Sequence, residues 1–178
     1  DRNVKAIYPE GFDPHIQSAI DDNSISIGVR TLYNGWNIDF NNTYGKNRMH
    51  FYVDGTLNAT LLEKWPTHFD AGGFWFSQNT TGVTFSRLFE TVASGLNIAF
   101  GAEHRTDRYN IFAGEEGSWR NYGLRDTIIN GSIVQYDAIG RPAGSQGFPG
   151  FQPRNEVTAS RTNFGTFLDV ELDVTRSF

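Results

Sequence analysis

Five side chains between residues 115 and 122 could recognise a ligand. They are Glu115, Glu116, Trp119, Arg120 and Tyr122. Aromatic rings provide flat surfaces on which other rings stack, and carboxylates and guanidinium groups form charge-assisted hydrogen bonds. We therefore take these five residues as candidates for binding a sugar or a siderophore. The alternative is a solvated loop whose side chains pack on their neighbours.

Other reactive residue types do not form a motif for catalysis or metal binding. The chain has no cysteine, and its four histidines lack the spacing of metal ligands. Glu103 and His104 are adjacent, so in a strand they face opposite sides. The Glu115-Glu116 pair could imitate the two carboxylates of a glycosidase, but adjacency in a loop fits that role poorly. We expect no catalytic residue, no metal and no cofactor, and thus a protein that is not an enzyme.

The composition points to strands and turns. Hydrophobic residues make up only 38% of the 178 residues, whereas aromatic residues reach 15% and glycine is frequent, with 19 copies. Disordered chains are poor in aromatic residues, so disorder is disfavoured. The net charge of −5 disfavours a phosphate-binding surface, and we expect no nucleic-acid partner.

Alternation of apolar and polar residues predicts an all-β chain. Residues 1–22 read as an irregular lead-in or external loop, and Asn34-Gly35 is a strong hairpin signal. Long loops are expected near 54–73 and 112–158, the second with a possible short hairpin around Asn130-Gly131. Five main strands are expected near 24–33, 36–53, 74–90, 96–111 and 160–175.

Two features favour a transmembrane β-barrel over a soluble sheet. The polar face of the strands carries many charges, and the connections alternate between tight turns and long loops. The strands also match or exceed the roughly 9–11 residues of a tilted membrane crossing. Five strands cannot close such a barrel, so we expect 23–178 to be part of a larger one.

This interpretation assigns the two faces of the strands. The residues expected to face the lumen are Asp39, Asn41, Glu103, Arg105, Asp169 and Glu171. The residues expected to face lipid are Ile38, Phe40, Leu96, Ile98, Phe100, Leu168, Val170 and Leu172. The lumen residues either line a solute path or plug surface, or form ion pairs that satisfy their own charges. Strand alternation places Arg87 on the apolar face. We therefore expect Arg87 to lie near a tight turn, where its guanidinium group can reach water.

Several motifs resemble an internal barrel segment of TonB-dependent outer-membrane receptors. The resemblance covers roughly residues 8–178. The motifs are 33–36 with 42–47, Leu57-Asn58-Ala59, Phe69-Asp70-Ala71-Gly72-Gly73-Phe74 with Gln78-Asn79-Thr80-Thr81, 96–105 with Phe112-Ala113-Gly114-Glu115-Glu116, Gly144-Ser145-Gln146-Gly147-Phe148-Pro149-Gly150-Phe151, and 159–161 with 167–171.

The resemblance implies an antiparallel segment of a 22-stranded barrel in the bacterial outer membrane. Such receptors contain a plug domain and take up scarce nutrients such as iron-siderophore complexes, vitamins or oligosaccharides, with energy delivered through TonB. The implied partners are the rest of the barrel and plug, outer-membrane lipid, and TonB through an N-terminal part that this chain lacks. A surface lipoprotein or a larger outer-membrane assembly is a further candidate partner. The alternative from another class is a soluble, secreted β-sandwich that binds carbohydrate through its aromatic loops.

Overall fold

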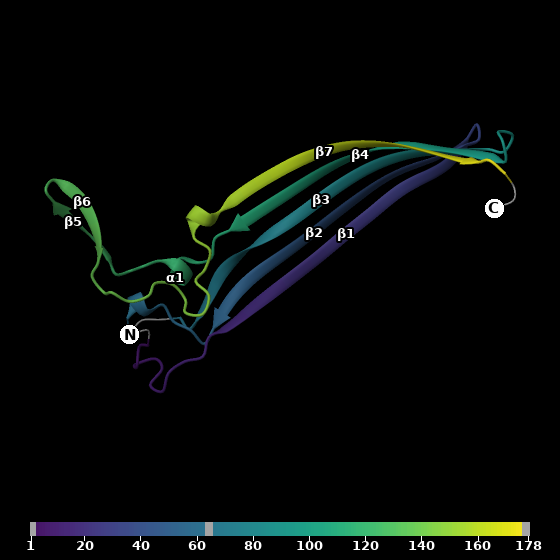
Figure 1. Ribbon diagram of the computed structural model, residues 1–178. Helices are drawn as coiled ribbons and strands as arrows, with labels where there is room; N and C mark the ends of the chain where they lie inside the picture. The colour runs from purple at the N-terminus through teal and green to yellow at the C-terminus, as the bar shows by residue number, and fades with distance from the viewer. Residues whose placement is uncertain (1–2, 63–65, 176–178) are drawn as a thin grey trace. The chain divides into compact units, whose positions relative to one another are not determined.

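The computed structural model describes residues 3–62 and 66–175 and is all-β, with antiparallel sheets. The all-β prediction is therefore confirmed. The main sheet has five strands in the order β1-β2-β3-β4-β7, and a smaller sheet pairs β5 with β6 (Figure 1). Within the described residues the main sheet is open, with β1 and β7 at its edges.

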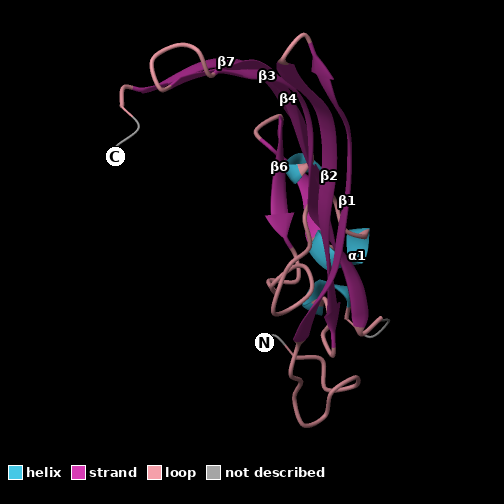
Figure 2. Cartoon of the chain, turned by 90° about the vertical axis from the view of Figure 1, so that its right-hand side faces the viewer, coloured by secondary structure: helices cyan, strands magenta, loops and turns pink. Residues whose placement is uncertain are grey.

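The strands of the main sheet are β1 (His15–Tyr33), β2 (Trp36–Asp54), β3 (His68–Phe89), β4 (Gly95–Phe112) and β7 (Val157–Asp173). The smaller sheet contains β5 (Leu124–Ile129) and β6 (Ser132–Asp137). The helical segments are η1 (Ala59–Leu61), α1 (Glu116–Trp119) and η2 (Pro153–Asn155); they are short and lie in the connections (Figure 2). No helix among the described residues has both the length and the apolar character needed to cross a membrane.

The two Asn-Gly pairs form tight turns, as the sequence predicts. Asn34 and Gly35 have φ of 49° and 79°, and Asn130 and Gly131 have φ of 50° and 80°. Positive φ at both central residues is typical of the type I′ turn, whose twist matches that of a hairpin. The first pair connects β1 to β2, and the second connects β5 to β6 in the middle of the 112–158 stretch.

The first strand is longer than the sequence predicts. Residues 15–22 belong to β1, whereas we expected an irregular segment up to residue 22. Its residues are exposed on both faces, so no alternation of apolar and polar residues is required there. Backbone pairing with β2 rather than side-chain burial makes this segment a strand, and a pattern search cannot detect that.

The third strand also begins early, at His68 rather than near residue 74. The Gly72-Gly73 pair suggested a loop, but it lies inside the strand, where Gly72 has φ of 76°. A glycine in this conformation is typical of a β-bulge, which bends a strand and shifts its alternation without ending it. β7 likewise begins at Val157, slightly before the expected residue 160.

The chain divides into two compact units, each built from three segments. Unit 1 comprises Asp1–Asp21, Arg48–Trp75 and Asn110–Thr158. It contains a small hydrophobic core of Val4, Leu57 and Ala59, against which Tyr8 and Phe12 pack. The rings of Tyr8 and Phe12 stack at 5.4 Å. Unit 1 thus has an interior of its own, to which the segment before β1 and the connection between β2 and β3 contribute.

Unit 2 comprises Asp22–Asn47, Phe76–Tyr109 and Ala159–Phe178 and consists mainly of strands and tight turns. All six buried hydrophobic residues of the part of the chain that the structure describes belong to unit 1: Val4, Val53, Leu57, Ala59, Phe69 and Ala71. The many apolar residues of unit 2 are partly or largely exposed. An exposed apolar surface of this extent is typical of a surface that contacts another protein or a membrane.

Candidate functional site

The side chain of Asn58 connects two long connections of unit 1. Its Oδ1 accepts hydrogen bonds from the Thr60 backbone N–H at 3.1 Å and the Thr60 hydroxyl at 2.7 Å. Its Nδ2 donates to the backbone oxygens of Gly117 and Arg120 at 2.8 and 2.9 Å. Asn58 is only 1% exposed. It therefore fixes the segment that carries the candidate ligand-binding residues.

A second set of backbone bonds joins this segment to residues 144–151. The carbonyl of the buried Ser118 accepts from the amides of Ser145 and Gly150 at 3.0 and 2.9 Å. The amide of Phe151 donates to Ala71, and the amide of Gly114 donates to Phe151. Stretches 57–59, 69–74, 112–120 and 144–151 thus meet in one hydrogen-bonded layer, although they are far apart in the sequence.

Replacing Asn58 by alanine is expected to destabilise this layer by about 2–4 kcal/mol, because several buried partners lose a hydrogen bond at once. Hydrogen exchange at the amides of Ser145 and Gly150 should accelerate in the variant. Asn163→Ala, on the exposed strand β7, is the matched control and should change exchange at those amides little. Equal protection of the amides in both variants would contradict the role assigned to Asn58.

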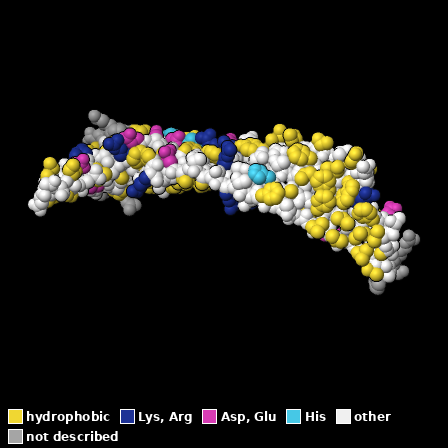
Figure 3. All heavy atoms as spheres, turned by 90° about the horizontal axis from the view of Figure 1, so that it is seen from above, with side chains coloured by type: hydrophobic (Ala, Val, Ile, Leu, Met, Phe, Trp, Pro, Cys, Tyr) yellow, Lys and Arg dark blue, Asp and Glu magenta, His cyan; other side chains and the backbone are white. Residues whose placement is uncertain are grey.

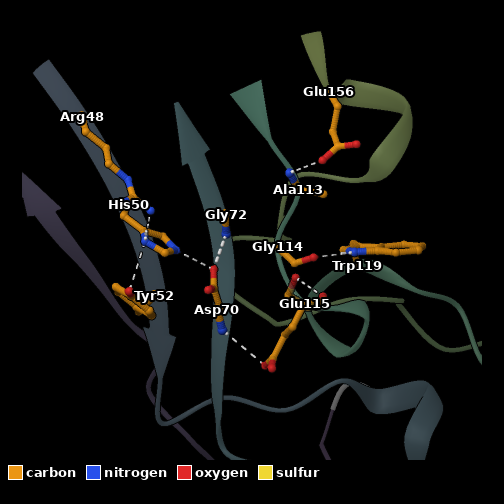
Figure 4. A network of polar contacts seen from close by, with 11 residues as sticks. Arg48, His50, Tyr52, Asp70, Gly72, Ala113, Gly114, Glu115, Trp119 and Glu156 are labelled. Atoms are coloured by element: carbon orange, nitrogen blue, oxygen red, sulfur yellow. Dashed lines mark hydrogen bonds and ion pairs between the residues drawn. The ribbon is translucent and has the colours of Figure 1, made fainter. Parts of the chain in front are cut away.

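A polar network joins β2 and β3 to the beginning of the 113–156 connection (Figure 4). His50 and Asp70 point toward one another, with Nε2 and Oδ1 2.8 Å apart. The same Asp70 oxygen accepts from the Gly72 amide at 2.7 Å, and the Asp70 amide donates to Glu115 at 3.3 Å. The Glu115 amide in turn donates to the Asp70 carbonyl. Glu115 therefore holds the connection on the strand.

Trp119 also has a structural contact. Its indole Nε1 donates to the Gly114 carbonyl at 3.2 Å (Figure 4). Arg120 forms an ion pair with Glu116, and its guanidinium lies 5.4 Å from the centre of the Tyr122 ring. Burial raises the pKa of the Tyr122 phenol, and the neighbouring Glu116 carboxylate raises it further.

The candidate ligand-binding residues therefore do not all have the same surroundings. Trp119, Arg120 and Tyr122 line an open groove of about 930 Å³, together with residues of the β5–β6 hairpin and of 143–154. Glu115 and Glu116 do not line this groove. The groove is also lined by Arg125, Gln135 and Arg154, which were not among the predicted binding residues. Gln135 and Arg154 are distant in sequence from residues 115–122, and Arg125 follows Tyr122 closely but is not part of any recognisable motif.

Asp137 fixes the base of the hairpin beside the groove. Its carboxylate accepts hydrogen bonds from Asn121 Nδ2 at 2.9 Å and from the amides of Ile139 and Gly140 at 2.9 and 2.8 Å. These hydrogen bonds, of which the one from Asn121 has the largest effect, hold the pKa of Asp137 below its usual range. The carboxylate therefore stays ionised, and these bonds persist, at neutral pH.

One face of unit 2 carries a chain of polar contacts. Arg30 and Asp39 form an ion pair at 2.6 Å, and Asn41 donates to Asp39 at 3.1 Å. On β4, Asp107 accepts from Gln78 at 2.9 Å and from Arg161 at 2.7 Å. Strand alternation places the predicted lumen residues on this face: Asp39, Asn41, Glu103, Arg105, Asp169 and Glu171. Among them, Arg105 lies 3.6 Å from Asp107, and Glu171 accepts from Asn97 at 3.2 Å.

The opposite face of unit 2 is apolar and exposed. Ring contacts between Trp36, Phe85 and Phe100 place these residues of β2, β3 and β4 on one side of the sheet. Because side chains alternate between the two faces of a strand, the predicted lipid-facing residues lie on this same side of the sheet: Ile38, Phe40, Leu96, Ile98, Phe100, Leu168, Val170 and Leu172. Leu168, Val170 and Leu172 are 71%, 56% and 53% exposed. Figure 3 shows hydrophobic side chains gathered on the part of the molecule that contains the tight turns.

Along each strand this face changes from apolar to polar. On β2 the apolar residues Trp36, Ile38 and Phe40 precede Asn42, and Lys46 and Arg48 follow. The same face of each other strand changes likewise. From the tight-turn end, and apart from Thr31, Arg87 and Thr166, its residues are apolar as far as Asn23 on β1, Thr81 on β3, His104 on β4 and Thr162 on β7.

On β2, β3, β4 and β7 these changes lie at similar heights. Asn42 donates to Thr81 at 2.7 Å. The contacts of Gln78 with Asp107, and of Asp107 with Arg161, fix the register of the next two strand pairs. The apolar residues therefore form one continuous band on the side of the tight turns.

Arg87 lies on this apolar face, as its parity predicts. Its guanidinium carbon is 4.6 Å from the centre of the Phe89 ring and 6.0 Å from that of Trp36. Such cation–π contacts stabilise a guanidinium group on an apolar surface. Arg87 also lies only a few residues before the tight turn that connects β3 to β4. Both features reconcile its charge with its position.

Among residues 3–62 and 66–175, no group of three or more His, Asp and Glu side chains is arranged to hold a metal ion. Comparison of the chain with models of protein families, with curated proteins and with solved structures finds no match in any of the three.

Proposed function

We propose that this chain is part of the β-barrel of an outer-membrane receptor of the TonB-dependent type, which takes up scarce nutrients such as siderophore-bound iron, a vitamin or an oligosaccharide. The observation that carries the proposal is the exposed apolar band of unit 2. A bilayer supplies the apolar environment that this band needs, and outer-membrane barrels carry an outward apolar band about 25 Å tall.

The lengths of the strands support a membrane crossing that continues into water. The strands of the main sheet have 17 to 22 residues, whereas a tilted crossing needs only about 9–11. The polar continuation of the apolar face on each strand then lies outside the hydrocarbon region. Tight turns at one end of the strands and long connections at the other are the arrangement found in such barrels.

The polar face of unit 2 fits the lumen of the barrel. Its ion pairs and amide contacts, such as Arg30 with Asp39 and Arg161 with Asp107, satisfy charges that would be costly in lipid. The two open edges of the sheet, β1 and β7, would pair with further strands, because unpaired backbone groups are not tolerated within a bilayer. The rest of the barrel, a plug domain and TonB are the partners in this proposal.

A soluble β-sandwich that binds carbohydrate has less support. Two packed sheets bury the apolar face of each sheet against the other. Leu168 and Val170 are more than half exposed, as are Ile27 and Val29 on the other edge strand. Among the residues that the structure describes, no specific contact favours the sandwich.

Fractionation of the source cells tests the proposal. The protein containing this chain should sediment with the outer membrane, resist extraction by alkaline carbonate and enter solution only with detergent. Carbonate removes proteins that are bound to the membrane surface, so resistance separates insertion from adsorption. Recovery of a folded, monodisperse protein without detergent would contradict the proposal.

A further inference from the structure

We propose that the groove of unit 1 binds the carboxylate groups of an acidic saccharide, that is, an oligosaccharide containing uronic acid units. The inference rests on the proposed function, because it names the class of nutrient that the receptor would take. The groove is lined by Trp119, Arg120, Tyr122, Arg125 and Arg154, among others, and has a volume of about 930 Å³. Ligand pockets commonly have volumes of roughly 300–1,000 Å³.

The charge of the groove is opposite to that of the chain. Three arginines and one acidic residue, Asp126, line the groove, whereas the chain as a whole carries −5. Glu116, which pairs with Arg120, lies outside the lining and neutralises only one of the three arginines. The lining therefore favours a ligand with negative charge.

Two of the guanidinium groups keep donors for a ligand. Within residues 3–62 and 66–175, the Arg125 side chain donates only through Nη1, to the backbone oxygens of Tyr122 and Leu124 at 2.9 and 2.8 Å. For Arg154, no side-chain hydrogen bond or ion pair is found within the described part of the chain. Guanidinium groups with free N–H pairs bind carboxylates through two parallel hydrogen bonds. Arg125 and Arg154 can thus each engage one carboxylate.

The remaining lining residues suit sugar rings rather than a bare anion. Trp119 and Tyr122 offer aromatic surface, and the Trp119 ring is fixed by its bond to Gly114. Gln135 donates to Asp126 at 3.3 Å, which leaves its side-chain oxygen as an acceptor for a hydroxyl group. Aromatic surface, amide groups and free guanidinium groups together match a saccharide that carries carboxylates.

Calorimetric titration of the full-length receptor in detergent tests the proposal. The probes are trigalacturonate, the neutral trisaccharide galactotriose and inorganic phosphate. We expect trigalacturonate to bind at least tenfold more tightly than either of the others. Equal affinity for galactotriose would overturn the role of charge, and equal affinity for phosphate would overturn the role of the sugar.

Two pairs of variants locate the site. Arg154→Gln should weaken trigalacturonate binding by about tenfold or more, the effect of one charge-assisted contact. Arg141→Gln removes an arginine of the same connection that does not line the groove and should leave the affinity unchanged. Tyr122→Ala should likewise weaken binding, whereas Tyr136→Ala on the hairpin should not. Equal affinities within each pair would overturn the proposed site.

The two proposals can fail separately. A protein that resists carbonate extraction but does not prefer trigalacturonate would refute the acidic saccharide and leave the receptor assignment standing. A protein that is soluble without detergent would refute the receptor assignment, whatever the titration gives.

Discussion

Replacing Gly72 by alanine should destabilise unit 1 by roughly 3 kcal/mol. Gly72 has φ of 76°, which costs a residue with a side chain about 1–2 kcal/mol. A Cβ atom there would lie only 2.5 Å from both the Gly114 nitrogen and the Phe112 oxygen. These are backbone atoms that cannot rotate away, so overpacking adds about 1–3 kcal/mol. Urea unfolding of the purified protein, combined with hydrogen exchange at the Glu115 amide, measures the loss.

Gly131→Ala provides the matched control. Gly131 has nearly the same φ, 80°, but nothing lies within 4 Å of the position of an added Cβ. It therefore shows the backbone strain without the steric clash, and should cost about 1–2 kcal/mol, with no change in exchange at Glu115. If the two alanine variants lose equal stability, the close approach of the two strands at Gly72 is not as described.

Val170→Arg is the second substitution with a large expected effect. Val170 lies in the apolar band and is 56% exposed. In water, a substitution at such a position changes stability by no more than about 0.5 kcal/mol. In a bilayer, an arginine on the lipid face costs about 2–4 kcal/mol near the midplane. Unfolding of the full-length protein from lipid vesicles should show the larger value.

Thr158→Arg is its control. Thr158 lies on the same face of β7, but in the polar part of that face, which the apolar band does not reach. In the proposed orientation it lies outside the hydrocarbon region, so the substitution should cost less than about 1 kcal/mol. A small and equal effect of both arginines would place the whole face in water and remove the main support for the receptor.

The sequence alone was sufficient for those parts of the fold that follow from alternation and from turn residues. The Asn34-Gly35 and Asn130-Gly131 turns are where the sequence predicts them, and the all-β class is confirmed. The starts of β1 and β3 were not predictable. Residues 15–22 form a strand although their side chains are exposed on both faces, and Gly72-Gly73 interrupts the alternation without ending β3.

The loop site shows a similar limit. The types and spacing of residues 115–122 indicated recognition chemistry, and Trp119, Arg120 and Tyr122 do line a groove. The same groove is also lined by Arg125, which closely follows Tyr122, and by the distant Arg154, and no motif in the sequence indicates either residue. The structural role of Asn58 was equally hidden, because its four bonds depend on how distant loops meet.

Site-directed spin labelling tests the central claim, the membrane-facing band, most directly. These 178 residues contain no cysteine, so single cysteines can be introduced along β7, with any cysteine elsewhere in the full-length protein replaced by serine. In the full-length protein in lipid vesicles, labels at Leu168, Val170 and Leu172 should be relaxed by oxygen, which concentrates in the bilayer. Labels at Thr158 and Ser160 should respond instead to a water-soluble nickel chelate. Strong nickel relaxation at Leu168, Val170 and Leu172, or their protection from both reagents, would contradict a lipid-facing band.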